Sequence, residues 1–149
     1  MSGNYTFTII KPGAVHNEYI GPIITMITNA GFHIAALKLV KLRPEEAAMF
    51  YEIHRGKAFY ESLIEFMTSG PIVVALLEKE NAVEDYRKLI GSTDPNKAEL
   101  GTIRRLFAES LQANAVHGSD SNDNARQEAD FFFAKNERFD RYGGCCLYN

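Results

Sequence analysis

Residues 114–122 read Asn114-Ala115-Val116-His117-Gly118-Ser119-Asp120-Ser121-Asn122, and this stretch constrains the chain more tightly than any other. One histidine lies beside a glycine, between an asparagine and a Ser-Asp pair that could open a helix. A neutral imidazole is a good nucleophile, and Gly118 removes a side chain that would crowd an incoming group. Polar residues spaced this closely are poor core filler. The stretch therefore predicts a reactive histidine rather than a packing residue.

Four strands are expected around and before this stretch. Residues 5–11 carry β-branched and aromatic side chains, and residues 34–42 follow as a second strand. Residues 72–77 are continuously apolar, which is typical of a central strand buried on both faces. Residues 111–116 can form a last short strand that delivers His117 to its end.

Helices are expected between and after these strands. Ile20, Ile23, Ile24 and Ile27 fall on one stripe of an amphipathic helix that Gly31 can end. Similar stripes, together with start and stop signals, predict further helices at residues 43–54, 59–67, 81–90, 102–111 and 123–133.

This order of elements favours an α+β sandwich of the ferredoxin-like βαββαβ type with extra helices. Its core is a four-stranded antiparallel sheet, and we expect helices to cover one face of that sheet. No linker, internal repeat or low-complexity segment interrupts the pattern, so residues 1–149 are expected to form one domain.

Composition limits the classes of function. Of the 149 residues, 46% are hydrophobic and 23% charged, as in ordinary soluble proteins. A net charge of -3 argues against a general nucleic-acid binder, although a few arginines and lysines could still hold a small anion. No apolar run approaches the ~20 residues of a membrane span, so a cytoplasmic protein is expected. The adjacent Cys145 and Cys146 fit neither a C-x-x-C site nor a disulfide framework.

Candidate site residues are few. The chain has no P-loop, no G-x-G-x-x-G and no H-R-D motif. Lys11, Arg87 and Arg104 lie near expected turns, together with His117. The other histidines, His16, His33 and His54, lie in segments that packing explains and are interpreted as surface or capping residues.

Several motifs together resemble the nucleoside diphosphate kinases. The stretch at 114–121 is similar to their active-site signature N-x-x-H-G-S-D-S. The likeness covers nearly the whole chain. It includes I-K-P in residues 8–12, F-Y-x-x-H-x-G-K-x-F at 50–59, T-S-G-P at 68–71 and G-x-T-[DN]-P-x-x-A-x-x-G-T-I-R at 91–104.

The resemblance implies a role for each matching residue. His117 would be the phosphorylated nucleophile, acting through Nδ1, with Glu128 and Ser119 orienting it and Tyr51 beside it. Lys11 and Asn114 would contact the sugar hydroxyls, and Lys11 would also lie near the transferring phosphate. Arg87, Thr93 and Arg104 would hold the β- and γ-phosphates. Phe59 would stack on the base, and Leu63 and Leu111 would line the cleft.

From the residues alone, blander interpretations stay open. Phe59, Leu63, Phe66 and Met67 form a helical stripe that is more often core, and an isolated Glu128 is more often a solvated acid. The resemblance instead favours an exposed Phe59 with Phe66 and Met67 turned inward.

The activity that the resemblance implies is a ping-pong phosphotransfer. The γ-phosphate of a nucleoside triphosphate, typically ATP, would pass to His117 and then to a nucleoside diphosphate, with broad base specificity. Mg²⁺ would arrive on the substrate phosphates, without a dedicated protein site. A homo-oligomer is implied, a hexamer rather than a tetramer, with no membrane or nucleic-acid partner.

Two alternatives remain at this point. One is a catalytically silent relative that acts through binding. The other is a ferredoxin-like RNA-binding module, because residues 55–60 faintly resemble the R-G-[FY]-x-[FY] core of an RNA-recognition strand.

Overall fold

A single antiparallel sheet organises the chain. The structure is a computed structural model that describes residues 3–144, and within this range four strands pair in the order β2-β3-β1-β4. The central strands are β1 (Tyr5–Ile10) and β3 (Ile72–Glu78), and the edges are β2 (His33–Val40) and β4 (Val116–Gly118). The predicted four-stranded antiparallel sheet is therefore confirmed. Cys145 and Cys146 lie outside the described residues.

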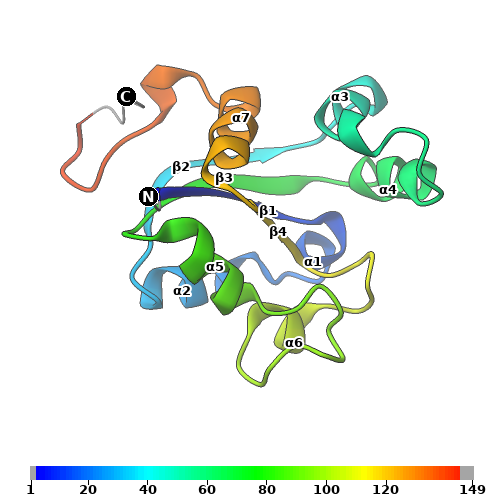
Figure 1. Cartoon of the computed structure of the whole chain (residues 1–149), viewed down its shortest axis with the longest axis horizontal. Helices are drawn as coiled ribbons and strands as arrows, with labels where there is room; N and C mark the ends of the chain where they lie inside the picture. Colours follow the sequence, from blue (N-terminus) through cyan, green and yellow to red (C-terminus); the bar gives the residue numbers. More distant parts are fainter. Residues whose placement is uncertain (1–2, 145–149) are drawn as a thin grey trace.

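Helices pack on both sides of this sheet (Figure 1). On one side lie α3 (Pro44–Phe50), α4 (Tyr60–Met67) and α7 (Asn122–Phe132), and on the other α1 (Pro12–His16), α2 (Ile20–Asn29), α5 (Ala82–Ile90) and α6 (Ile103–Phe107). Short 3-10 turns follow at Glu52–His54 and Lys135–Glu137. Among residues 3–144, no helix has the length and the apolar character that a membrane span requires.

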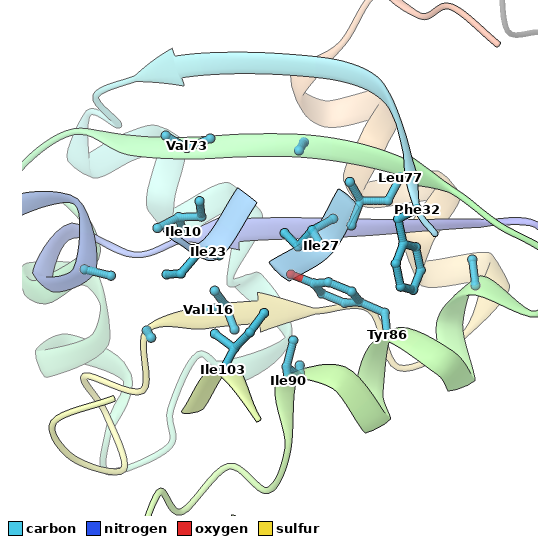
Figure 2. Packing of buried hydrophobic residues seen from close by; sticks show 14 residues of the cluster. Ile10, Ile23, Ile27, Phe32, Val73, Leu77, Tyr86, Ile90, Ile103 and Val116 are labelled. Carbon is cyan, nitrogen blue, oxygen red and sulfur yellow. The ribbon is translucent and has the colours of Figure 1, made fainter. Parts of the chain in front are cut away.

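Two apolar cores result, one on each face of the sheet. Phe7 and Ile9 of β1 enter the core under α3, α4 and α7, whereas Ile10 enters the core under α2 and α5 (Figure 2). The expectation that helices cover one face is therefore wrong. The side chains of β1 point to both faces and nearly all of β1 and β3 is buried, so both faces need apolar partners, and the extra helices supply the second layer.

The last strand also differs from its prediction. Residues 111–115 are irregular, and β4 begins at Val116, so His117 lies within the strand rather than beyond it. The cause is Ala115, whose φ of +74° turns the chain just before the ladder begins. The helix predicted for residues 102–111 is likewise shorter, because Ala108 is extended and ends α6 at Phe107.

Candidate active site

A cleft of about 820 Å³ opens where β4, α5, α7 and the loop before α6 meet. Of the residues singled out from the sequence, six line it: Tyr51, Arg87, Thr93, Arg104, His117 and Glu128. Five further candidates do not line the cleft itself: Lys11, Phe59, Leu63, Leu111 and Asn114. Ser119 lies behind the cleft and is fully buried.

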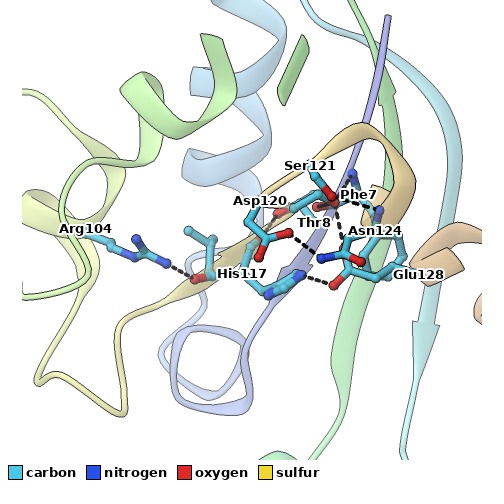
Figure 3. Close-up of polar contacts among 10 residues, drawn as sticks. Phe7, Thr8, Arg104, His117, Asp120, Ser121, Asn124 and Glu128 are labelled. Atoms are coloured by element: carbon cyan, nitrogen blue, oxygen red, sulfur yellow. Dashed lines mark hydrogen bonds and ion pairs between the residues drawn. The ribbon is translucent and has the colours of Figure 1, made fainter. Parts of the chain in front are cut away.

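The side chain of His117 is fixed by a carboxylate (Figure 3). Its Nε2 donates to Oε2 of Glu128 at 2.7 Å, and the Ser119 hydroxyl donates to the other oxygen, Oε1, also at 2.7 Å. Ser119 is itself held, because its Oγ accepts a hydrogen bond from the Phe7 backbone at 3.0 Å. Both oxygens of Glu128 are thus engaged, and Nδ1 is the imidazole nitrogen left for chemistry.

Helix α7 brings Glu128 to this position. The Ser121 hydroxyl caps the helix by accepting from the Asn124 backbone at 3.1 Å, and Asp120 accepts from the Asn124 side chain at 2.5 Å. Because the cap fixes where the helix begins, it also fixes the turn from which Glu128 faces His117.

Aromatic rings enclose the imidazole. The rings of Phe7 and Phe50 each lie 6.2 Å from that of His117, centroid to centroid, at steep angles. Tyr51 is buried beside them, and burial, followed by the negative charge of Glu128, raises the pKa of its phenol well above the ordinary value. Tyr51 therefore stays protonated at neutral pH and can donate a hydrogen bond into the cleft.

Positive charge gathers at one end of the cleft. Arg104 is only 8% exposed, and its guanidinium donates to the carbonyls of Gly91 at 3.0 Å and Val116 at 2.9 Å. Its Nε has no hydrogen-bond partner among residues 3–144. Burial, and then the charge of Arg104, lower the pKa of Lys11 to about 8. Two buried cations near one another favour binding of an anion.

A strained turn precedes the histidine. Ala115 adopts φ +74°, and the Val116 backbone donates to the Asn114 carbonyl at 2.9 Å, which closes a γ-turn. The Ala115 carbonyl accepts from the Lys11 backbone at 2.8 Å, so the turn joins Asn114 to Lys11. No sequence signal indicates this turn, because alanine rarely adopts positive φ.

Ala115→Gly is expected to raise the free energy of unfolding by about 1 kcal/mol, because glycine adopts this φ without the steric cost that alanine carries. Urea unfolding monitored by circular dichroism checks the value. Ala125→Gly, a buried alanine within α7, is the matched control and should lower stability by a similar amount or more. An unchanged or lowered stability of Ala115→Gly would contradict the strain at this turn.

Gly118 is required for a reason that differs from the predicted one. A Cβ at this position would meet Ile90 Cδ1 at 2.9 Å and the Tyr86 ring at 3.1 Å. Both atoms belong to the core under α5, so the missing side chain makes room for the core rather than for an incoming group.

The far rim of the cleft carries the candidates for a stacking surface. Phe59 precedes α4 and is 47% exposed, while Met67 is buried and Phe66 partly buried. Leu111 is exposed, and a hydrogen bond of 3.1 Å from Gln112 to Ser62 brings its loop against α4, the helix that carries the half-buried Leu63.

His54 belongs to this rim, which the sequence interpretation did not anticipate. Its ring lies 5.3 Å from that of Phe59 and 6.3 Å from that of Tyr51, and it lines the cleft. Burial, then the nearby Lys57 and His117, lower the pKa of His54. The F-Y-x-x-H spacing could have predicted this position, because it places His54 one helical turn after Tyr51.

The structure does not favour the RNA-binding alternative. Residues 55–59 form turns that lead into α4, so the segment that resembles an RNA-recognition strand is not a strand. Helices pack on both faces of the sheet, so its central strands offer no open surface for bases.

Comparison with known proteins agrees with the site. The sequence model of the nucleoside diphosphate kinase family matches residues 4–138. A nucleoside diphosphate kinase of Flavobacterium psychrophilum is 54% identical over 139 residues, which are 93% of this chain and the whole of that relative. One of Chlorobium limicola is 52% identical over 132 residues, 89% of this chain and 94% of the relative.

Solved structures agree as well. The nucleoside diphosphate kinase of Aquifex aeolicus matches with a TM-score of 0.88 at 39% identity, covering 91% of this chain and 98% of that one. The halophilic enzyme of Halobacterium salinarum, solved in complex with CDP, has a TM-score of 0.88 at 33% identity, covering 93% of each chain. With a histidine held by a carboxylate in a cationic cleft, and with these likenesses over nearly its full length, the chain belongs to the nucleoside diphosphate kinase family.

Proposed function

We propose that this protein transfers the γ-phosphate of a nucleoside triphosphate, typically ATP, to a nucleoside diphosphate through a phosphohistidine on His117. One observation carries the proposal. The Nε2 of His117 is bound to Glu128 at 2.7 Å, in a cleft that also contains Arg87 and Arg104. Phosphoryl transfer needs this combination of an oriented nucleophile and cations that neutralise phosphate charge.

The chemistry follows from the hydrogen bonds. With the Nε2 proton donated to Glu128, the lone pair on Nδ1 attacks the γ-phosphorus, and the bond to the β–γ bridging oxygen breaks. The imidazole becomes positively charged, and the carboxylate of Glu128 stabilises that charge. The nucleoside diphosphate leaves, and a second one takes the phosphate by the reverse step.

Side chains around His117 can bind the phosphates and the sugar of a nucleotide. Arg87 and Thr93 are exposed within the cleft, and Arg104 closes its inner end. We assign the β- and γ-phosphates to these three residues, with the Tyr51 hydroxyl beside the γ-phosphate. Lys11 and Asn114, joined by the γ-turn, would contact the sugar hydroxyls, with Lys11 near the transferring phosphate.

The base would stack on Phe59. Its half-exposed ring offers a flat apolar face, and stacking reads no hydrogen-bonding edge of a base. Leu63 and Leu111 would line the nucleotide cleft near this ring. This arrangement supports broad base specificity.

A divalent metal fits the site as part of the substrate. Among residues 3–144, no group of three or more His, Cys, Asp or Glu side chains is arranged to hold a metal ion. Both oxygens of Glu128 are already engaged, which leaves Asp120 as a nearby carboxylate at the cleft wall. Mg²⁺ bound to the nucleotide phosphates would neutralise part of their charge.

Glu128→Gln is expected to slow phosphorylation of His117 by about 10²-fold. The amide cannot stabilise the imidazolium, and an amide NH₂ facing Nε2 would shift the ring proton to Nδ1, which then cannot attack. The measurement is the single-turnover rate of labelling by γ-labelled ATP. Asp123→Asn, an exposed acid on the same helix, is the control and should leave the rate unchanged. A Glu128→Gln rate within twofold of wild type would remove Glu128 from the mechanism.

The pH dependence should reflect Lys11, whose pKa in the free protein is about 8. Below this pH the ammonium is charged and attracts phosphate, so kcat/KM for ATP should fall about tenfold between pH 7 and pH 9. Loss of the folded state does not explain this fall of kcat/KM. Between pH 8 and the ordinary lysine pKa the unfolded chain binds more protons, so the Lys11 contribution to stability rises with pH. In Lys11→Gln the fall of kcat/KM between pH 7 and pH 9 should be absent. If the fall persists in this variant, Lys11 is not its cause.

We further propose a cytoplasmic homo-oligomer, a hexamer rather than a tetramer, in which residues 1–149 form one domain. The edge strand β2 supports self-association because Leu37 and Leu39 are 49% and 64% exposed. Sedimentation velocity distinguishes the two assemblies, and a monomer would contradict both.

Initial-rate kinetics test the proposed function as a whole. A phosphohistidine intermediate predicts parallel double-reciprocal plots when the triphosphate is varied at several fixed diphosphate concentrations. Intersecting lines would require both nucleotides to bind at once, and would overturn the proposal.

A further inference from the structure

We propose that Thr8 and Tyr86 are positioning residues for His117: a buried pair of hydroxyls that fixes the backbone of the nucleophile from the side of the sheet opposite Glu128. The inference rests on the proposed function, because it assigns a role in phosphorylation of His117. Neither residue lines the cleft, so neither would touch the nucleotide.

The direction of the hydrogen bonds is fixed by chemistry. The Thr8 hydroxyl lies 2.7 Å from the carbonyl oxygen of His117 and 2.7 Å from the hydroxyl of Tyr86. A carbonyl cannot donate, so the single proton of Thr8 is committed to His117. Tyr86 must then donate to Thr8. The result is a directed chain from Tyr86 through Thr8 to the backbone of the nucleophile.

Tyr86 is held rigidly at the start of this chain. It is fully buried on α5, and Figure 2 shows its ring within the apolar core with the hydroxyl pointing towards β1. The ring packs edge-on against Phe32, at 5.5 Å between centroids, and fills the space beside Gly118. Burial raises the pKa of the Tyr86 hydroxyl well above its ordinary value, so it keeps the proton that it donates.

The contact matters because it holds the carbonyl of the nucleophile itself, on the short edge strand β4. This edge strand is three residues long, and β1 is its partner in the sheet, with Thr8 opposite Gly118 and Ile9 opposite His117. Arg104 holds the carbonyl of Val116 and Thr8 holds the carbonyl of His117 (Figure 3). Two successive carbonyls of β4 are thus each held by a side chain, while Glu128 fixes the imidazole. A nucleophile displaced by even a fraction of an ångström reacts more slowly.

Three variants test the chain: Thr8→Val, Tyr86→Phe and the double variant. Thr8→Val removes the donor to His117 and leaves the buried Tyr86 hydroxyl unpaired, so we expect its Tm to fall by about 5 °C and its phosphorylation rate by about tenfold. Tyr86→Phe alone should slow the reaction about twofold, because Thr8 can still donate to His117.

The double variant separates positioning from stability. Removing both hydroxyls leaves no unpaired buried donor, so its Tm should recover most of the loss caused by Thr8→Val. Its phosphorylation rate should nevertheless stay about tenfold low, because the His117 carbonyl still lacks its donor. A residue that acted through stability alone would give a rate that recovers together with the Tm.

Two matched controls accompany these variants. Thr8→Ser keeps the hydroxyl and should retain a rate within about twofold of wild type. Thr6→Val makes the same substitution at a buried threonine of β1 whose hydroxyl has no partner among residues 3–144, and should leave the rate unchanged.

The readouts are single-turnover labelling of His117 by γ-labelled ATP, the Kd for ADP from calorimetry, and the Tm. The expected pattern is a slow Thr8→Val and a slow double variant with ADP affinity within about twofold of wild type, since neither Thr8 nor Tyr86 lines the cleft. Full-rate labelling of Thr8→Val, or recovery of the rate in the double variant, would overturn the inference. A wild-type protein that takes no label would instead overturn the proposed function.

Discussion

Replacing His117 with alanine is expected to lower the rate of phosphate exchange at least about 10⁴-fold, because the reaction loses the atom that carries the phosphate. The fold should persist. Ser119 still donates to Glu128 at 2.7 Å, and His117 is not a member of either apolar core. ADP should bind with an affinity within about threefold of wild type, since its implied contacts are Arg87, Arg104 and Phe59.

The measurement is ATP-to-GDP exchange, with circular dichroism as the check on folding. His16→Ala, the loss of an exposed histidine in α1, is the matched control and should retain full exchange. Substantial exchange by folded His117→Ala would mean that phosphate passes directly between nucleotides.

The second large effect is expected from Arg104→Ala, with a fall of about 10²- to 10³-fold in kcat. This change removes a cation from the inner end of the cleft and also frees the carbonyls of Gly91 and Val116. ADP affinity should suffer less, because much of the lost interaction is made with the phosphate in transit. Arg104→Lys should recover only part of the rate, since an ammonium cannot hold two carbonyls as a planar guanidinium does.

Arg104→Ala should leave a second signature. The charge of Arg104 lowers the pKa of Lys11, so its removal should move the alkaline limb of kcat/KM to higher pH. Arg105→Ala removes the neighbouring exposed arginine and should change neither the rate nor the pH profile. An unchanged profile in Arg104→Ala would show that the two cations are not coupled.

Much of the fold follows from local patterns. The apolar run at 72–77 predicts the central strand, the isoleucine stripe predicts α2, and Gly31 with φ +94° stands where that helix ends. The side of the sheet on which each helix lies depends on long-range packing. The apolar run at 72–77 indicates burial on both faces, but no local pattern shows which helices supply the second layer.

Some features of the site can also be predicted from local sequence, and others cannot. The family resemblance is what implies Glu128 as the partner of His117, since an isolated acid on a helix is more often solvated. Residue type and spacing predict only His117, as the nucleophile. They do not predict the γ-turn at Ala115 or the core contacts that require a glycine at 118, since both depend on atoms far away in sequence. The pairing of Thr8 with Tyr86 spans 78 positions and leaves no local signal.

A pulse–chase labelling experiment tests the central claim most directly. The protein is incubated with γ-labelled ATP and Mg²⁺, freed of nucleotide, and then mixed with unlabelled GDP. We predict an acid-labile label on His117 that passes to GDP and appears as GTP. A folded protein that acquires no label, or a label that stays on the protein when GDP is added, would contradict the phosphohistidine mechanism.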